Sequence, residues 1–149
     1  MNMFKNILVP TDGSALSRSA INAAAKLAKS LGAKLTAVYA APPATPLVYK
    51  DLLPVGYGTS AEHAAAIRKA AEHYLGVVEK AAKAAGVPYK LIQTTSDFPA
   101  DVILATAKKE KCDLIFIASH GQGGLKRVLL GSQTQKVLAG AKIPVFVHR

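Results

Sequence analysis

The stretch Asn6-Ile7-Leu8-Val9-Pro10-Thr11-Asp12-Gly13-Ser14 begins with a short apolar run that a proline ends, and a helical pattern follows it directly. From Leu16 to Leu31 the apolar residues recur on one helical face, and Gly32 is a suitable C-terminal cap. A strand that leads into an amphipathic helix is the repeating unit of α/β folds. We therefore expect a strand over residues 5–10 and a helix over residues 16–31.

The same alternation continues along the chain. Four further apolar runs follow, and their closing residues are 38–40, 91–92, 114–118 and 145–147. Helical patterns cover residues 60–85, 99–107 and 132–138. Strands that are continuously apolar and alternate with helices indicate a parallel sheet covered on both faces. We predict an α/β fold in a single domain over residues 1–149, a doubly wound five-stranded parallel sheet of order 3-2-1-4-5.

One segment lacks both patterns. Residues 41–58 contain four prolines and two glycines, at positions 42, 43, 46, 54, 56 and 58. Irregular segments of this length are usually functional or disordered. We expect a mobile loop over residues 41–58.

The chain has 149 residues, half of them apolar, which is enough to bury a core without disulfides or bound metal. Its longest apolar runs, such as residues 114–118, are far shorter than the ~20 residues that cross a bilayer. The first residues hold too short an apolar run for a signal peptide, and Cys112 is the single cysteine. We expect a cytoplasmic protein with Cys112 buried or half-buried between a helix and a strand.

The net charge of +10 is large for this length, and a basic protein attracts phosphates, nucleic acids and lipid headgroups. The basic residues are scattered, and the densest group is the mixed run Lys108-Lys109-Glu110-Lys111. Surfaces that bind nucleic acid usually gather their charge on one element. The spacing therefore favours an ordinary solvated surface over nucleic-acid binding.

The segment from Ala118 to Ser132 leaves the predicted fourth strand and enters the fourth helix. Its glycines allow close approach of the backbone to a ligand, and the first N–H groups of a helix can bind a phosphate. A plain turn followed by Ser132 as an N-cap explains the same residues equally well. Neither the P-loop pattern nor the three-glycine dinucleotide fingerprint is present.

The loop Thr11-Asp12-Gly13-Ser14 follows the predicted first strand. Asp12 or Ser14 could simply cap the helix that follows. In open α/β sheets, however, ligands bind at the carboxyl ends of the strands where the strand order reverses. For the order 3-2-1-4-5 this point lies between strands one and four, so the two loops would meet there.

These residues resemble the universal stress protein family. Residues 6–14 are similar to the family's opening, and residues 143–147 to its closing strand. ATP-binding members carry the motif Gly-x2-Gly-x9-Gly-(Ser/Thr), and Gly121, Gly131 and Ser132 reproduce its last three fixed positions. The resemblance covers essentially the whole chain and implies a fold like that of the adenine-nucleotide alpha hydrolases.

Ala118 stands at the first glycine position of the motif, a departure that adds one methyl group where the backbone would approach a ligand. By position, the resemblance implies four groups of residues around the nucleotide. Pro10, Thr11 and Asp12 would lie at the nucleoside and Ala40 at the adenine. Around the ribose and phosphates would lie Ala118, Ser119, His120, Gly121, Gln122, Gly123 and Gly124, and at the phosphates Gly131, Ser132, Gln133 and Thr134.

The resemblance implies a nucleotide-dependent stress-response or regulatory protein that binds ATP or a related adenine nucleotide, and Mg²⁺ or Mn²⁺ would be the accompanying metal ion. It also implies a homodimer paired through strand 143–148. His120 has no acidic partner or nucleophile nearby in the sequence, so we expect a structural or ligand-contact role and at most slow ATP hydrolysis. The alternative is a homodimeric interaction module with an empty cleft, which Ala118 is consistent with.

Overall fold

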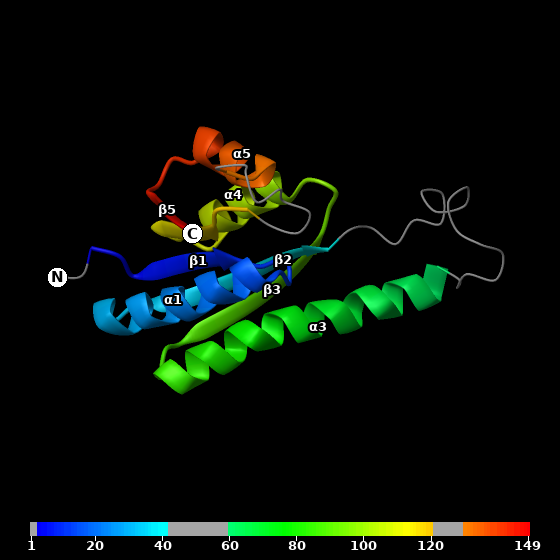
Figure 1. Ribbon diagram of the computed structural model, residues 1–149, viewed down its shortest axis with the longest axis horizontal. Helices are drawn as coiled ribbons and strands as arrows, with labels where there is room; N and C mark the ends of the chain where they lie inside the picture. The colour runs from blue at the N-terminus through cyan, green and yellow to red at the C-terminus, as the bar shows by residue number, and fades with distance from the viewer. Residues whose placement is uncertain (1–2, 42–59, 121–129) are drawn as a thin grey trace.

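A computed structural model describes residues 3–41, 60–120 and 130–149, which form a parallel sheet with helices on both faces (Figure 1). The strands are β1 (Asn6–Pro10), β2 (Lys34–Ala41), β3 (Tyr89–Thr95), β4 (Leu114–Ala118) and β5 (Val145–His148), and the helices are α1 (Ala15–Leu31), α3 (Ser60–Ala85), α4 (Pro99–Lys109) and α5 (Ser132–Gly140). The sheet order β3-β2-β1-β4-β5 confirms the predicted order. The predicted mobile loop lies outside the described residues except for Ala41, which ends β2.

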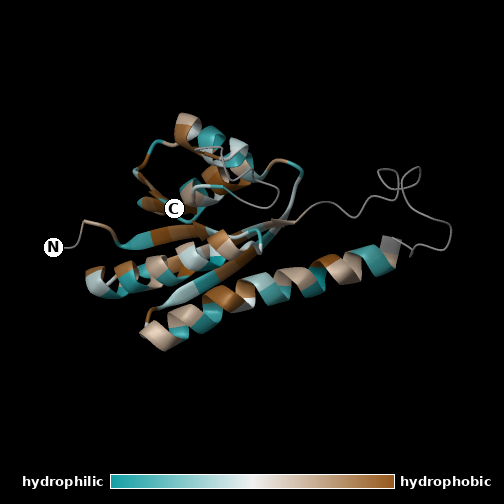
Figure 2. Ribbon diagram, viewed as in Figure 1, coloured by the Kyte–Doolittle hydropathy of each residue, from teal (hydrophilic) through white to brown (hydrophobic). Residues whose placement is uncertain are grey.

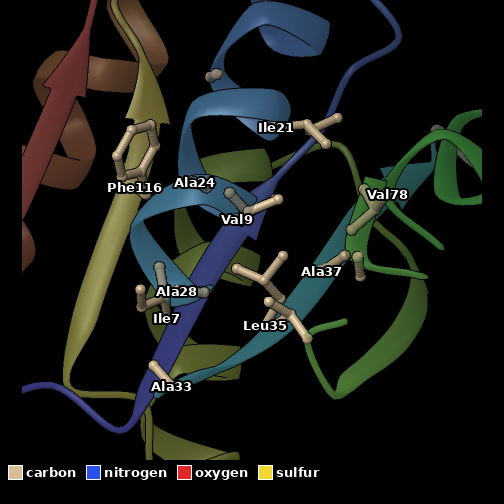
Figure 3. Close-up of a cluster of buried hydrophobic side chains, with 14 of the residues drawn as sticks. Ile7, Val9, Ile21, Ala24, Ala28, Ala33, Leu35, Ala37, Val78 and Phe116 are labelled. Carbon is tan, nitrogen blue, oxygen red and sulfur yellow. The ribbon is translucent and has the colours of Figure 1, made fainter. Parts of the chain in front are cut away.

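Helices α1 and α3 cover one face of the sheet, and α4 and α5 cover the other. The residues of β1 alternate between the two faces: Ile7 and Val9 pack into the α1 side (Figure 3), while Leu8 packs into the α4 side. All three side chains are fully buried, and such burial contributes about 1.5–3 kcal/mol per side chain. The continuous apolar run of β1 is therefore explained by burial on both faces.

Local signals in the sequence set the helix ends. The Oγ of Ser14 accepts the N–H of Ser17, so Ser14 rather than Asp12 caps α1. Gly32 ends that helix with φ at 66°, a left-handed conformation that glycine adopts without strain. Pro99 occupies the first turn of α4, as expected.

Helix α3 extends past the carboxyl ends of the strands (Figure 1). No residue from 61 to 70 is buried, and the buried stripe begins at Ala71 and continues through Leu75, Val78 and Ala82. The helix alternates hydrophilic and hydrophobic residues along its length (Figure 2). Because the buried residues of α3 begin at Ala71, only the second half of this helix packs against the sheet.

Cys112 is buried between α4 and β4, as predicted. Burial raises the pKa of its thiol to about 11, so the thiol is protonated at neutral pH. Among the described residues, no helix combines the length and apolar character that crossing a membrane requires.

Candidate functional site at the carboxyl end of the sheet

Strands β1 and β4 are neighbours at the point where the strand order reverses. β1 pairs with β2 along all five of its residues, from Asn6 to Pro10, but it pairs with β4 only at Ile7 and Leu8. The β1–β4 ladder therefore stops before either strand ends. Ligands of open α/β sheets bind at this position, which agrees with the expectation from the sequence.

The turn after β1 is held by its own hydrogen bonds. An Oδ1 of Asp12 accepts the N–H of Ser14 at 2.9 Å, and the Oγ1 of Thr11 accepts the N–H of Gly13 at 3.3 Å. The hydroxyl of Ser17 also donates to Thr11 Oγ1, at 2.9 Å. These bonds place the half-buried Asp12 at the carboxyl end of β1.

Two tyrosines, Tyr39 and Tyr74, support this turn, and no pattern in the sequence near the turn indicates them. The ring of Tyr39 in β2 meets the ring of Tyr74 in α3 edge to face, with centroids 5.2 Å apart. Burial raises the pKa of the Tyr39 hydroxyl, and Tyr74 and Asp12 raise it further. Gly13 has φ at 81°, and a Cβ added to it would lie 2.5 Å from Tyr74 Cζ. Helix α3 therefore packs directly against the turn that carries Asp12.

The chain leaves β4 through Ser119 and His120 and returns at Gly131. The N–H of Gly131 donates to the carbonyl of Ser119 at 2.7 Å, and the Ser119 hydroxyl lies 3.1 Å from His120 Nδ1. A Cβ on Gly131 would lie 3.0 Å from both Cα and Cβ of His120. Because φ at Gly131 is −68°, the position requires glycine for space and not for backbone conformation.

The N-terminus of α5 corrects one interpretation of the sequence. Gly131 is the N-cap and Ser132 is the first helical residue, so Ser132 is not the N-cap. Gly131 makes no side-chain capping hydrogen bond because it has no side chain. Within the described part of the chain, no N-cap side chain therefore takes up the N–H groups of the first turn, and such groups attract anions.

Two polar side chains of this turn have structural partners. The hydroxyl of Thr134 donates to the carbonyl of Ala118 at 2.9 Å, and Gln133 Oε1 accepts the N–H of Ala100 at 3.1 Å. Both bonds tie α5 to its neighbours, β4 and α4. The side chains of Gln133 and Thr134 thus position the start of α5.

Ala118 is the last residue of β4 and Ala40 the last but one of β2, and they face opposite sides of the sheet. Ala118 belongs to the core cluster on the α1 side and is 9% exposed. Ala40 is half-buried and packs against the cluster on the α4 side. The methyl group of Ala118 therefore fills core space at the end of β4.

The structure brings most of the predicted site residues to one end of the sheet: Pro10, Thr11, Asp12, Ala40, Ala118, Ser119, His120, Gly131, Ser132, Gln133 and Thr134. The remaining four, Gly121, Gln122, Gly123 and Gly124, lie outside the described residues. Within residues 3–41, 60–120 and 130–149, no three His, Cys, Asp or Glu side chains gather as a metal site would require.

Comparison with known proteins agrees with this geometry. The profile of the Universal stress protein family matches residues 3–149. The chain belongs to the universal stress protein family. A universal stress protein of Methanocaldococcus jannaschii is 34% identical over 151 residues, covering 98% of this chain and 82% of the relative. One from Thermus aquaticus is 33% identical and covers 99% of this chain and all of the relative.

Solved structures of universal stress proteins share the fold. UspA of Lactobacillus plantarum superposes with a TM-score of 0.72 at 27% identity, covering 98% of each chain. Two structures with a similar fold contain nucleotides. One is a universal stress protein in complex with cAMP, at a TM-score of 0.73 and 23% identity over 98% of this chain and 97% of the other. The other, from Archaeoglobus fulgidus, is in complex with dAMP, at 0.67 and 18% over the whole of both chains.

Proposed function

We propose that this universal stress protein binds ATP or a related adenine nucleotide over the end of the β1–β4 ladder and acts as a nucleotide-dependent regulator. The observation that carries the proposal is the placement of two turns at the switch point: Asp12 follows β1, and the N-terminus of α5, whose N-cap has no side chain, follows β4. An acidic side chain and an anion-binding helix end at the same edge of the sheet fit the two parts of a nucleotide, the nucleoside and the phosphates. The cAMP and dAMP complexes of proteins with this fold support it.

In this proposal the phosphates are bound by backbone N–H groups at the start of α5. The side chains of Gln133 and Thr134 already bond to Ala100 and Ala118, so they orient the turn that presents those groups. Gly131 keeps the turn close to His120 because it carries no Cβ. The methyl group of Ala118 lies in the core on the α1 side, which leaves room for the phosphates at the first motif position.

Turnover of the nucleotide should be slow. Among the described residues, the hydrogen-bonding partner of the His120 ring is the hydroxyl of Ser119, which does not strengthen His120 as a base in the way that a carboxylate would. Phosphoryl transfer also depends on neutralising charge and orienting the nucleophile. A bound Mg²⁺ or Mn²⁺ would supply charge neutralisation at the phosphates. We assign the bound nucleotide a regulatory role.

Isothermal titration calorimetry with ATP and Mg²⁺ tests the proposal. Wild-type protein should give a saturable heat, and Asp12→Ala should weaken binding by at least about tenfold, or about 1.4 kcal/mol. Asp101→Ala is the matched control, since Asp101 is an exposed carboxylate in the first turn of α4. It should bind as wild type does. No heat and no thermal stabilisation at millimolar ATP would refute nucleotide binding.

A homodimer paired through β5 is the second part of the proposal. β5 is an edge strand among the described strands. Pro144 and His148 direct their carbonyls to β4, so by alternation the backbone N–H and C=O of Val145 and Val147 point to the open edge. Phe146 is 47% exposed and stacks on Phe116 with ring centroids 4.4 Å apart. An open edge with an exposed aromatic ring suits pairing with a second copy.

Val147→Pro tests this arrangement without removing a hydrogen bond to β4, because proline is tolerated where the N–H of an edge strand points outward. Analytical ultracentrifugation should show a dimer for wild type and a monomer for the variant. Val147→Ala is the control and should remain dimeric. A proline variant that stays dimeric would exclude pairing through β5.

A further inference from the structure

The amino end of the sheet carries a row of lysines. Proceeding across the sheet, Lys90 is the second residue of β3, Lys34 the first of β2, and Lys5 directly precedes β1. Lys111 lies three residues before β4, and Lys142 lies three residues before β5. Every described strand thus begins beside a lysine, and all five lysines are exposed. We call these five residues the lysine rim.

The rim is regular because the sheet is regular. Neighbouring strands lie about 4.8 Å apart, so the row spans about 19 Å. β1 and β3 begin, and α1 and α3 end, at the same side of the molecule (Figure 1, left). The helices therefore add lysines from their last turns, Lys29 of α1, Lys83 of α3 and Lys108 and Lys109 of α4.

Helix dipoles account for part of this charge. A helix C-terminus carries about half a negative charge, and lysines in the last turn stabilise it. The ends of the four described helices thus offset about two positive charges. Three carboxylates lie near this end, those of Glu79, Glu110 and Asp113, and they offset three more. With Lys80, which follows Glu79 in α3, ten lysines at this end leave an excess of about five positive charges.

Most of the rim is not neutralised by ion pairs. Within the described part of the chain, Lys90 is the rim member with a salt bridge, 2.8 Å from Glu110. The nearby ammonium groups of Lys90, Lys109 and Lys34 hold the pKa of Glu110 below its ordinary value, chiefly through the hydrogen bond from Lys90. Several lysines therefore converge on one carboxylate.

The backbone that carries the rim is anchored. The carboxylate of Asp113 accepts the N–H groups of Lys5 at 2.8 Å and of Asn6 at 3.0 Å. The buried side chain of Asn6 donates to the carbonyl of Glu110 and accepts the hydroxyl of Thr36. These bonds join β1, β2 and the turn before β4, so the positions of the lysines relative to one another are set by the sheet.

We propose that the lysine rim binds the phosphate backbone of nucleic acid without reading its base sequence. A row of about 19 Å spans about five or six nucleotides of one strand along the duplex axis, at 3.4 Å each, and faces the phosphates on the near side of the duplex. A membrane-binding surface adds several apolar side chains that enter the lipid, whereas among the described residues Met3 is the large apolar side chain exposed beside the rim. Protein interfaces favour arginine and aromatic anchors, and the rim contains neither. Lysine ammonium groups act as compact point charges, and such charges can bind phosphates without reading the bases.

The test is fluorescence anisotropy of a fluorescein-labelled DNA duplex of mixed sequence, titrated with protein over a series of potassium chloride concentrations. For wild type, log K should fall linearly with log salt, by about 0.9 per neutralised phosphate. The rim variant Lys5→Gln/Lys34→Gln/Lys142→Gln should make that slope less steep by about 2–3. Its affinity at the lowest salt should fall at least about tenfold.

The matched control is Arg68→Gln/Lys69→Gln/Lys136→Gln, which removes the same charge from exposed residues of α3 and α5 away from the rim. It should keep the slope and affinity of wild type. Equal weakening by both variants would overturn the proposal, since net charge and not position would then carry binding. Thermal melting of both variants checks that neither result comes from unfolding.

Three other results would also overturn it. Wild-type protein that does not bind the duplex at low salt would remove the proposal outright. Tighter binding to phosphatidylserine vesicles or to polyglutamate than to DNA at equal salt would assign the rim to a membrane or to an acidic protein. Displacement of DNA by ATP would indicate that DNA binds at the carboxyl end of the sheet, whereas simultaneous binding of DNA and ATP supports binding at the rim.

Discussion

The two ends of the sheet use their residues differently. At the carboxyl end, Gly13 and Gly131 each sit where an added Cβ would overlap another residue. At the amino end, the lysines extend into solvent above a layer of buried hydrogen bonds through Asn6. The comparison shows that the carboxyl end is specified by close packing and the amino end by charge. Added atoms should therefore disturb the first, and altered charge the second.

The largest effect is expected for Gly13→Ala at the carboxyl end. A residue with a Cβ in the left-handed conformation costs about 1–2 kcal/mol, and displacing the ring of Tyr74 adds to this. Chemical denaturation should show a loss of about 2–3 kcal/mol. In a Tyr74→Ala background the same substitution should cost about 1 kcal/mol less. Equal costs in both backgrounds would show that the ring does not press on the turn.

A smaller loss is expected for Gly131→Ala, because its backbone conformation is ordinary and only the space beside His120 is lacking. Stability should fall by about 1–2 kcal/mol, and ATP binding should weaken by at least about tenfold if the phosphates lie at this turn. Gly76→Ala is the control. Nothing lies within 4 Å of a Cβ there, and alanine in a helix interior should stabilise α3 by about 0.5–1 kcal/mol.

The substitution Ala118→Gly tests whether the departure from the family motif at this position changes the affinity for ATP. Removing a buried methyl group and loosening a strand should cost about 1 kcal/mol of stability. Since that methyl group lies in the core on the α1 side, we expect ATP affinity to change by less than about threefold. A large gain in affinity by calorimetry would show instead that the methyl group obstructs the nucleotide.

The smallest effect on stability is expected for Lys90→Gln at the amino end. This change removes the ion pair with Glu110, in which the lysine side chain is 58% exposed and the glutamate side chain 16% exposed. Ion pairs that are open to solvent on one side often contribute little to stability. The midpoint of thermal unfolding should stay at the wild-type value. The slope of log K for DNA against log salt should become less steep by about 0.9, the value for one phosphate contact. A destabilisation as large as that of Gly131→Ala would break the contrast between the two ends.

Much of the fold could be predicted because its signals are local. The apolar run of β1 is explained by burial on both faces, and Pro99 and Gly32 mark helix ends through their backbone conformations. The site was predicted in outline for the same reason, since parallel strands bring the loops after β1 and β4 to one edge. The resemblance to the family supplied the individual residues.

Contacts between distant segments could not be predicted in this way. Nothing in the sequence near Gly13 indicates Tyr74, which approaches from α3. The N-cap at the start of α5 proved to be Gly131 and not Ser132, and Gly131 lies close to His120 from the end of β4. Such pairs depend on how the elements pack.

By itself, the sequence determined the order of strands and helices, their apolar faces and the glycines at the two turns, because periodicity and backbone preference act over a few residues. The tertiary structure alone decided which distant residues became neighbours. The lysines at positions 5, 34, 90, 111 and 142 are scattered along the chain, yet a parallel sheet returns the start of every strand to the same end. The parallel sheet therefore gathers lysines that are dispersed in the sequence into one row at its amino end.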